Sequence, residues 1–353
     1  MWLIQGLLSG EIEWSKSITN IFYSCTECGN CTENCRLYQW RAGKGKVFPE
    51  AWKIIKAVKE EAIEKFLTPP KVRDFLVNIR TQGNPYGEAS SKRGEWTKEQ
   101  IKIYEPEDEF LYHVGCVGSY DPEGQQAAIA LGYILEKSGI SFGILGNDES
   151  CDGNEVDMLG ERGMFEHLAR QNIQKFKNLE VKKIVTLSPH SYNALKNEYP
   201  KFGGDFEVFH YTQLLRDLIK DGKLRIPKTL NSKVTYHDPC FLGRHNNEYD
   251  SPREILSVIP GIEFVEMDRN RIHSFCCGGG GGNFYTDFLG GGEDSPARIR
   301  IREARDTGAD ILAVACPICL TMFKDALKIE GLEGKLAVKD MSEIVKEAWG
   351  QEE

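Results

Sequence analysis

The stretch VTYHDPC, residues 234–240, has a near copy earlier in the chain, FLYHVGC at residues 110–116. Each is a short run of β-forming residues that leads through Tyr-His to a cysteine. Two further pairs keep nearly the same offset. ESCDG around Cys151 matches FCCGG around Cys276 and Cys277, and VTLSPHSYNAL from residue 185 matches VACPICLTMF from residue 314. Three markers at one spacing, between 124 and 128 residues, indicate a tandem duplication.

Each copy alternates strand-like and helix-like segments, which predicts an α/β fold with parallel strand pairing. In the first copy we expect helices near residues 123–137 and 156–176 and a buried strand at 184–187; the second copy offers a buried strand at 311–315. We place the first repeat at residues 106–230 and the second at 231–353. In such sheets functional groups collect at the carboxyl ends of the strands, where most of the repeat markers lie.

Residues 1–105 differ in character and are predicted to form a small helical head and linker. An amphipathic stretch at 52–67 and a helix-like piece ending at Arg80 are followed by a polar, turn-rich segment, 83–94, which we expect to be a linker. The run RAGKGK, residues 41–46, lacks the spacing of a phosphate-binding loop and is predicted to be a solvated basic turn.

The head contains CTECGNCTENC, with the spacing C-x2-C-x2-C-x3-C. Short steps of this kind let successive thiolates reach different irons of a [4Fe-4S] cubane. Zinc is the alternative, although zinc pairs are usually separated by a longer spacing. Arg36 stands where a proline usually follows, so either Cys35 closes the same cluster or the local fold differs from a ferredoxin. The predicted ligands are Cys25, Cys28, Cys31 and Cys35.

The second repeat offers five thiols, one more than a cubane with four protein ligands requires. They are Cys240, Cys276, Cys277, Cys316 and Cys319. Adjacent cysteines project in different directions, so Cys276 and Cys277 favour a polynuclear site with a bridging thiolate. The glycines that follow, beginning with Gly278 and Gly279, would let backbone N–H groups curl around the sulfurs, or would leave room for a substrate.

These residues carry a resemblance. The pattern from Cys240 to Cys319, GNPYG at residues 83–87 and the head motif resemble the cysteine-rich CCG domain proteins of the heterodisulfide reductase family, including the iron-sulfur subunits of soluble class II benzoyl-CoA reductase complexes. The resemblance implies two CCG domains behind a ferredoxin-like [4Fe-4S] head. It also implies a noncubane [4Fe-4S] cluster on the five cysteines of the second repeat.

The first repeat departs from this pattern. Asp152 replaces the second adjacent cysteine, and Ser188 and Ser191 replace the C-x2-C pair, so only Cys116 and Cys151 remain. We expect this copy to have lost its cluster and to persist as scaffold. The alternative is a mixed-ligand metal site on Cys116, Cys151, Asp152 and His190.

The bulk composition excludes several classes of protein. A net charge of −9 argues against nucleic acid as a partner. The apolar runs are too short for a membrane span, MWLIQGLL at the start lacks the features of an export signal, and 11 cysteines at ligand spacings suggest an intracellular protein; we expect a cytoplasmic one. No flavin or nicotinamide fingerprint is present, so a flavoprotein or another iron-sulfur subunit is the expected partner.

The resulting expectation is an electron-transfer subunit of an oxidoreductase complex in anaerobic metabolism, which relays electrons between the cubane and the noncubane cluster. Two alternatives remain: a disulfide reductase whose substrate meets the second-repeat cluster, and a zinc-bearing structural adaptor. The candidate catalytic residues are Cys276, Cys277 and His237, the histidine as a proton donor because imidazole titrates near neutral pH.

Overall fold

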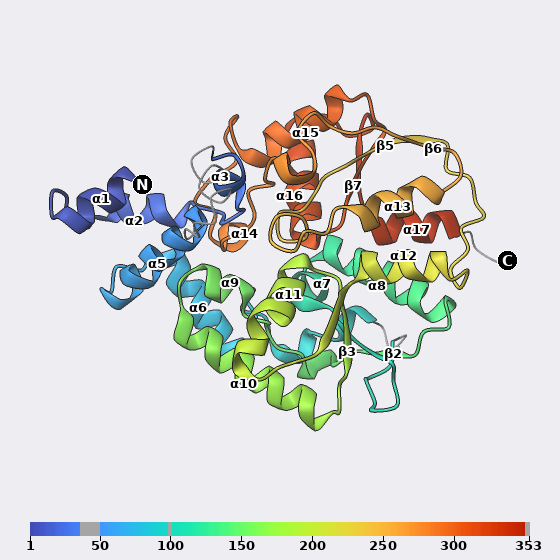
Figure 1. Cartoon of the computed structure of the whole chain (residues 1–353), viewed down its shortest axis with the longest axis horizontal. Helices are drawn as coiled ribbons and strands as arrows, with labels where there is room; N and C mark the ends of the chain where they lie inside the picture. Colours follow the sequence, from blue (N-terminus) through green and yellow to red (C-terminus); the bar gives the residue numbers. More distant parts are fainter. Residues whose placement is uncertain (36–49, 98–100, 350–353) are drawn as a thin grey trace, which may run out of the picture.

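The computed structural model describes residues 1–35, 50–97 and 101–349. The predicted basic turn at 41–46 lies outside these residues. Within them, two α/β layers stack one above the other, and the N-terminal helices project from one side (Figure 1).

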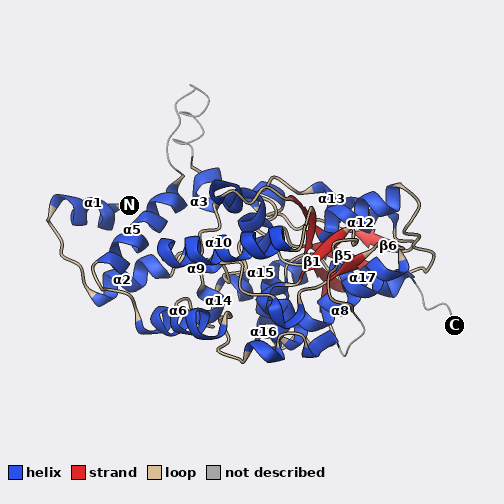
Figure 2. Cartoon of the chain, turned by 90° about the horizontal axis from the view of Figure 1, so that it is seen from below, coloured by secondary structure: helices blue, strands red, loops and turns tan. Residues whose placement is uncertain are grey.

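Each repeat contains a four-stranded sheet in which all neighbouring strands are parallel. The first has the order β2-β1-β3-β4 and the second the order β6-β5-β7-β8. The strands are β1 (Phe110–His113), β2 (Phe142–Gly143), β3 (Lys183–Thr186), β4 (Glu207–His210), β5 (Ser232–Tyr236), β6 (Ile262–Phe264), β7 (Ile311–Val314) and β8 (Ala337–Asp340). The identical order confirms the duplication and the α/β class, and both sheets lie at the end of the molecule away from the N-terminus (Figure 2).

The helices of the first repeat are α7 (Gly115–Tyr120), α8 (Pro122–Lys137), α9 (Asn154–Met158), α10 (Arg162–Asn178), α11 (Pro189–Asn193) and α12 (Tyr211–Lys220). The single helix predicted at 156–176 is wrong, because the chain breaks into α9 and α10 at Gly160. This glycine has φ +88°, and a Cβ there would lie 2.6 Å from the backbone nitrogen of Glu60. The break therefore lets a head helix pack directly against the repeat.

The second repeat contributes α13 (Asp250–Val258), α14 (Asn283–Thr286), α15 (Pro296–Asp306), α16 (Pro317–Ile329) and α17 (Met341–Trp349). Helix α8 of the first repeat packs against both α16 and α17. One apolar core runs through both repeats, from Phe110 and Leu131 to Leu312 and Ile344. The repeats are therefore held together by a shared interior.

The head is helical in its described residues. It consists of α1 (Trp2–Ser9), α2 (Lys16–Tyr23), α3 (Asn30–Glu33), α5 (Ala51–Glu64) and α6 (Pro70–Gln82). The segment 83–94, predicted to be a linker, is buried near its two ends, at Asn84 and Arg93, and exposed at residues 87–92. None of the helices described is both long enough and apolar enough to cross a membrane.

Candidate metal centres

The five second-repeat cysteines come together at the carboxyl edge of their sheet. Cys240 follows β5, Cys276 and Cys277 follow β6, and Cys316 and Cys319 follow β7. All five are buried. The Sγ atoms of Cys277 and Cys319 lie 3.3 Å apart, and further thiol contacts join Cys240 to Cys276, Cys276 to Cys277 and Cys316 to Cys319. The set predicted from spacing therefore forms one continuous group of sulfurs.

Some of these cysteines have a lowered pKa, which favours the thiolate form. Although burial opposes it, contacts from Cys319 and His190 lower the pKa of Cys316 to about 5. Hydrogen bonds from Cys276 and Cys319 lower the pKa of Cys277 well below its ordinary value, against the effect of burial. Because only the thiolate binds a metal, these contacts favour the ligating form.

The glycine run has two different roles. Gly278 N donates to Cys276 Sγ (3.2 Å), and Gly279 N donates to Cys277 Sγ (3.4 Å), as expected for a backbone that curls around sulfur. Gly280 and Gly281 face the head instead. A Cβ on Gly281 would lie 2.4 Å from the Cys25 carbonyl oxygen, so these positions are glycine because another part of the chain lies against them.

The head cysteine loop is therefore docked onto the second repeat. Cys28 lies against Cys276 and packs with Cys240. Arg244 Nε donates to the Cys28 carbonyl (2.6 Å), and His245 Nε2 donates to the Glu27 carbonyl (2.9 Å). Sequence reasoning predicted both thiol sets but not this junction, since no local pattern links residues separated by more than 200 positions.

The other head cysteines lie further out. Cys25 and Cys35 are half-buried, and Cys31 is the exposed one among the cysteines of the chain. Lys59 holds the head cysteine loop in place. Its Nζ donates to Glu27 Oε1 (2.7 Å), to the Cys25 carbonyl (3.1 Å) and to the Met158 carbonyl (3.1 Å). Burial raises the pKa of Glu27 to about 7 despite this lysine.

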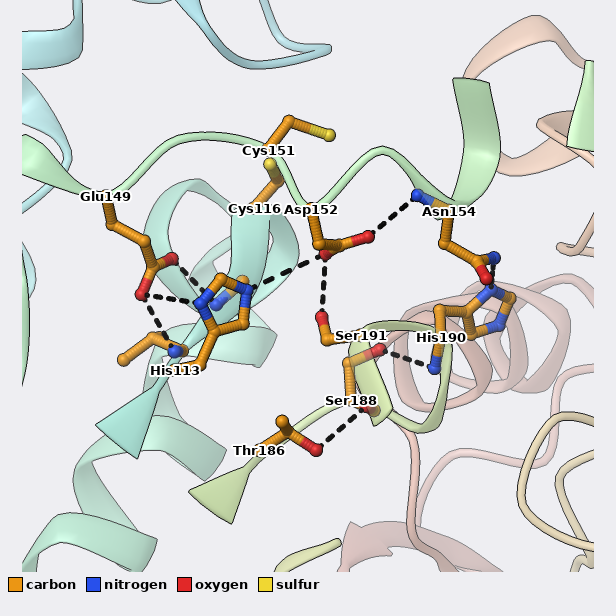
Figure 3. Close-up of polar contacts among 12 residues, drawn as sticks. His113, Cys116, Glu149, Cys151, Asp152, Asn154, Thr186, Ser188, His190 and Ser191 are labelled. Carbon is orange, nitrogen blue, oxygen red and sulfur yellow. Dashed lines mark hydrogen bonds and ion pairs between the residues drawn. The ribbon is translucent and has the colours of Figure 1, made fainter. Parts of the chain in front are cut away.

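The first repeat carries a polar network where the second carries sulfurs (Figure 3). Ser191 Oγ donates to Asp152 Oδ2 (2.8 Å), and the backbone N–H of Asn154 donates to Asp152 Oδ1 (2.8 Å). Cys116 and Cys151 remain in contact, as their counterparts Cys240 and Cys276 do. Of the five ligand positions, two thus still hold thiols and three hold the oxygen-bearing side chains of Asp152, Ser188 and Ser191.

Arg93 supports this network and was missed in the sequence, where the segment looks like a solvated linker. Its Nη2 donates to Glu149 Oε1 (2.7 Å) and lies 3.5 Å from Cys116 Sγ. Glu149 also accepts from the backbone N–H groups of Val114 (3.0 Å) and Gly115 (2.9 Å). A buried carboxylate with these partners is satisfied without a metal.

The four residues considered for a mixed-ligand site in the first repeat, Cys116, Cys151, Asp152 and His190, line one small cavity, and His190 turns to partners outside the set. His190 Nδ1 lies 2.6 Å from Glu155 Oε1, and its ring also contacts Cys316 of the other repeat. Although burial opposes the charge, Glu155 and Cys316 raise the pKa of His190 well above its ordinary value. Among the described residues, the group of acidic, cysteine or histidine side chains with convergent ligand atoms is His237, Cys277 and Cys319, in the second repeat.

His237 was predicted as a proton donor and lies beside the second-repeat sulfurs, buried and with a pKa well below its ordinary value. Burial is the main cause and the Arg300 guanidinium the next. Arg300 Nε donates to His237 Nδ1 (3.2 Å). Sequence reasoning missed Arg300, which is one of several arginines in a helix and carries no motif.

Fold and site together define a two-repeat cysteine-rich α/β protein with one complete thiol site and one partial one. The family model for the cysteine-rich CCG domain matches residues 110–196 and 234–324. The chain belongs to this family and contains two copies of its domain, which confirms the resemblance inferred from the motifs.

Three relatives show how the chain compares with longer proteins. It is 37% identical over 333 residues to the probable iron-sulfur-binding oxidoreductase FadF of Bacillus subtilis and 34% identical over 337 residues to the EtfAB:quinone oxidoreductase of Syntrophomonas wolfei. Each alignment covers 92% of this chain and 46% of the relative, so the chain spans about half the length of these proteins. It is also 34% identical to a subunit of the dihydromethanophenazine:CoB–CoM heterodisulfide reductase of Methanosarcina barkeri, covering 93% of this chain and 78% of that one.

Proposed function

We propose that the chain is an iron-sulfur electron-transfer subunit of a heterodisulfide reductase-like oxidoreductase complex. In this proposal Cys25, Cys28, Cys31 and Cys35 hold a [4Fe-4S] cubane, and the five second-repeat cysteines hold a noncubane [4Fe-4S] cluster. The observation that carries the proposal is the contact between Cys28 and Cys276, one from each predicted ligand set. Two centres whose ligands touch can exchange electrons without another carrier between them.

The second-repeat residues fit such a cluster. Five buried thiols, three of them with lowered pKa values, supply the ligands, and the Gly278 and Gly279 N–H groups donate to sulfur. Without a metal, several neighbouring thiolates would carry buried negative charge that these two N–H donors compensate only in part. When bound, the cluster would supply reversible one-electron chemistry.

The relay is favoured over a catalytic role because the second-repeat thiols are buried and only one of the two repeats has the complete thiol set. The second-repeat thiols are buried, whereas Cys31 of the head is exposed, which makes the head the side from which a partner exchanges electrons. The first repeat has Asp152 and Ser191 where a second cluster would need thiolates. A flavoprotein or another iron-sulfur subunit is the proposed partner.

A disulfide reductase is the second candidate, and one observation favours it. A cavity of about 260 Å³ reaches Gly278, and part of its lining is apolar, with Phe284, Leu289 and Met322. Charged side chains, Asp287, Arg298 and Asp325, also line it. A thiol substrate with an apolar part could approach the cluster there. The name of the Methanosarcina relative agrees with this chemistry.

Iron, sulfide and zinc analysis with EPR on anaerobically purified protein tests the proposal. We expect about eight irons per chain. Cys276→Ser should lose about four irons, and its first-repeat counterpart Cys151→Ser should retain all of them. Zinc alone, or equal iron loss in both variants, would contradict the proposal. A paramagnetic state that forms only when a disulfide is added would favour the reductase over the relay.

A further inference from the structure

His237 lies at the base of the second-repeat thiol site. Its side chain is 1% exposed, and one of its ring nitrogens lies within 4.8 Å of the sulfurs of Cys277 and Cys319. The ring packs edge-on against Phe323, with centroids 4.7 Å apart and an interplanar angle of 85°. At this position the ring nitrogen could bind a metal if it is unprotonated, or donate a hydrogen bond if it is protonated. The tautomer of the imidazole therefore distinguishes the two roles.

Arg300 determines where that proton resides. A guanidinium carries N–H donors and no acceptor, so in the 3.2 Å contact between Arg300 Nε and His237 Nδ1 the arginine must donate and Nδ1 must accept. A neutral imidazole whose Nδ1 accepts carries its proton on Nε2. Arg300 is itself held in place, because Nη1 donates to the Arg269 carbonyl (2.8 Å) and to Glu303 Oε2 (2.8 Å).

The protonated nitrogen has no other partner. His237 Nε2 is buried without a hydrogen-bond acceptor among the described residues. A buried N–H without an acceptor costs about 1–3 kcal/mol, so a native structure normally supplies one. The nearby groups that remain are the sulfurs of Cys277 and Cys319 and whatever they bind.

We propose that Arg300 is a positioning residue that holds His237 in its Nε2–H form, and that this N–H donates a hydrogen bond to the sulfurs of the second-repeat cluster. The inference rests on the proposed function, because it assumes a cluster on these thiolates. A donor to sulfur stabilises the more negative, reduced state and therefore raises the reduction potential. His237 is then neither a metal ligand nor a proton shuttle, because the N–H that faces the sulfurs is retained.

In the first repeat, the histidine that corresponds to His237 faces carboxylates and not an arginine and sulfurs. His113, the counterpart of His237, has Nδ1 3.5 Å from Glu149 Oε2 and Nε2 3.7 Å from Asp152 Oδ2. Both of its ring nitrogens face carboxylates, and the nearby Arg93 binds Glu149 instead of the imidazole. The arginine contact at Nδ1 thus occurs in the repeat that keeps its five thiols, and His113 offers a matched control.

The test is an EPR-monitored redox titration of the full chain with its clusters loaded, with iron content measured for every variant. His237→Leu removes the proposed hydrogen-bond donor to sulfur, and His237→Gln restores a donor. Arg300→Met removes the hydrogen bond that fixes the imidazole tautomer, and Arg300→Lys keeps a cationic donor to Nδ1. His113→Leu is the control. We expect a more negative midpoint potential of the second-repeat cluster in His237→Leu and Arg300→Met, recovery in His237→Gln and Arg300→Lys, and no change in His113→Leu.

A second readout separates a hydrogen bond from ligation. Electron-nuclear double resonance should detect an exchangeable proton near the cluster that disappears in His237→Leu, and ¹⁵N-histidine labelling should show only weak nitrogen coupling. Full iron content with an unchanged potential in His237→Leu would overturn the inference, as would strong nitrogen coupling. If His237→Leu fails to load iron, Arg300→Met decides by the same potential. A wild-type protein without iron would instead refute the proposed function.

Discussion

Ser191 Oγ donates a 2.8 Å hydrogen bond to Asp152 at the positions where, in the other repeat, the sulfurs of Cys319 and Cys277 lie 3.3 Å apart. The two repeats therefore keep the same contact with different chemistry. A hydroxyl and a carboxylate satisfy each other without a metal, whereas two neighbouring thiolates repel each other unless a cation lies between them. The Ser191–Asp152 pair therefore holds the first-repeat loops together without a metal at these two positions.

Asp152→Ala should destabilise the protein without changing its iron content. The variant leaves Ser191 and the Asn154 N–H without their acceptor and removes a carboxylate facing His113, at a cost of roughly 2–4 kcal/mol in the free energy of unfolding. Asp152→Asn keeps an acceptor and should lose less. Denaturant unfolding and iron analysis are the measurements, and loss of iron in Asp152→Ala would mean that the first repeat holds metal.

Gly281→Ala should weaken the docking of the head on the second repeat. The new Cβ would lie 2.4 Å from the Cys25 carbonyl oxygen at a backbone φ of +60°, so the loop bearing Cys28 must move. We expect a loss of roughly 2–4 kcal/mol and slower electron exchange between the two centres in freeze-quench EPR. Gly334→Ala is the control, since Gly334 has φ +76° and no atom within 4 Å; it should cost only about 1 kcal/mol and leave the rate unchanged. Equal effects would show that the contact is unimportant.

Lys59→Met should be strongly destabilising. Lys59 and Glu27 form a 2.7 Å ion pair with both side chains 0% exposed, so the variant leaves a buried carboxyl group unpaired and costs roughly 3–5 kcal/mol. Lys59→Met combined with Glu27→Gln should lose less than the two single variants added together. The solvent-exposed pair Lys92–Glu88, at 2.9 Å, is the comparison, and Lys92→Met should leave the free energy of unfolding nearly unchanged. Additive losses in the double variant would contradict the coupling.

Asp340→Asn should flatten the dependence of stability on pH. Burial raises the pKa of Asp340 to about 7, although Ser342 and Tyr211 donate hydrogen bonds to it. The unfolded chain releases this proton near pH 4 and the folded chain near pH 7, so the folded state binds more protons between these values and stability falls as pH rises. Relative to the variant, the wild type should lose roughly 2–3 kcal/mol between pH 5 and pH 8. Parallel unfolding curves for the two proteins would rule this out.

The predictable parts of the site are those that follow from short stretches of the sequence. Cys240, Cys276 and Cys319 each lie in a loop or helix start after a parallel strand, and such segments meet at one edge of a sheet. The departure of the first repeat from the ligand pattern was visible in Asp152 and Ser191, which stand at ligand positions. A strand pattern and a ligand type can both be read without knowledge of distant contacts.

The parts that were missed depend on packing between distant segments. Arg93 lies in a polar, turn-rich segment and becomes buried only because Glu149 and Cys116 surround it. Arg300 belongs to a helix with several arginines, and its contact with His237 is a property of the fold. Neither arginine differs in local pattern from a solvated one.

The sequence by itself determined the duplication, the α/β class, the two thiol sets and the incomplete ligand pattern of the first repeat, because repeats, periodicity and ligand spacing are local properties of the chain. Only the tertiary structure decided that the head cysteine loop touches the second-repeat site, that Gly280 and Gly281 are needed for that approach, and that Arg300 orients His237. Those relations arise from close packing of segments far apart in sequence. The absence of a Cβ at Gly281 lets the Cys25 carbonyl approach, and the orientation of the Arg300 guanidinium brings its Nε to His237.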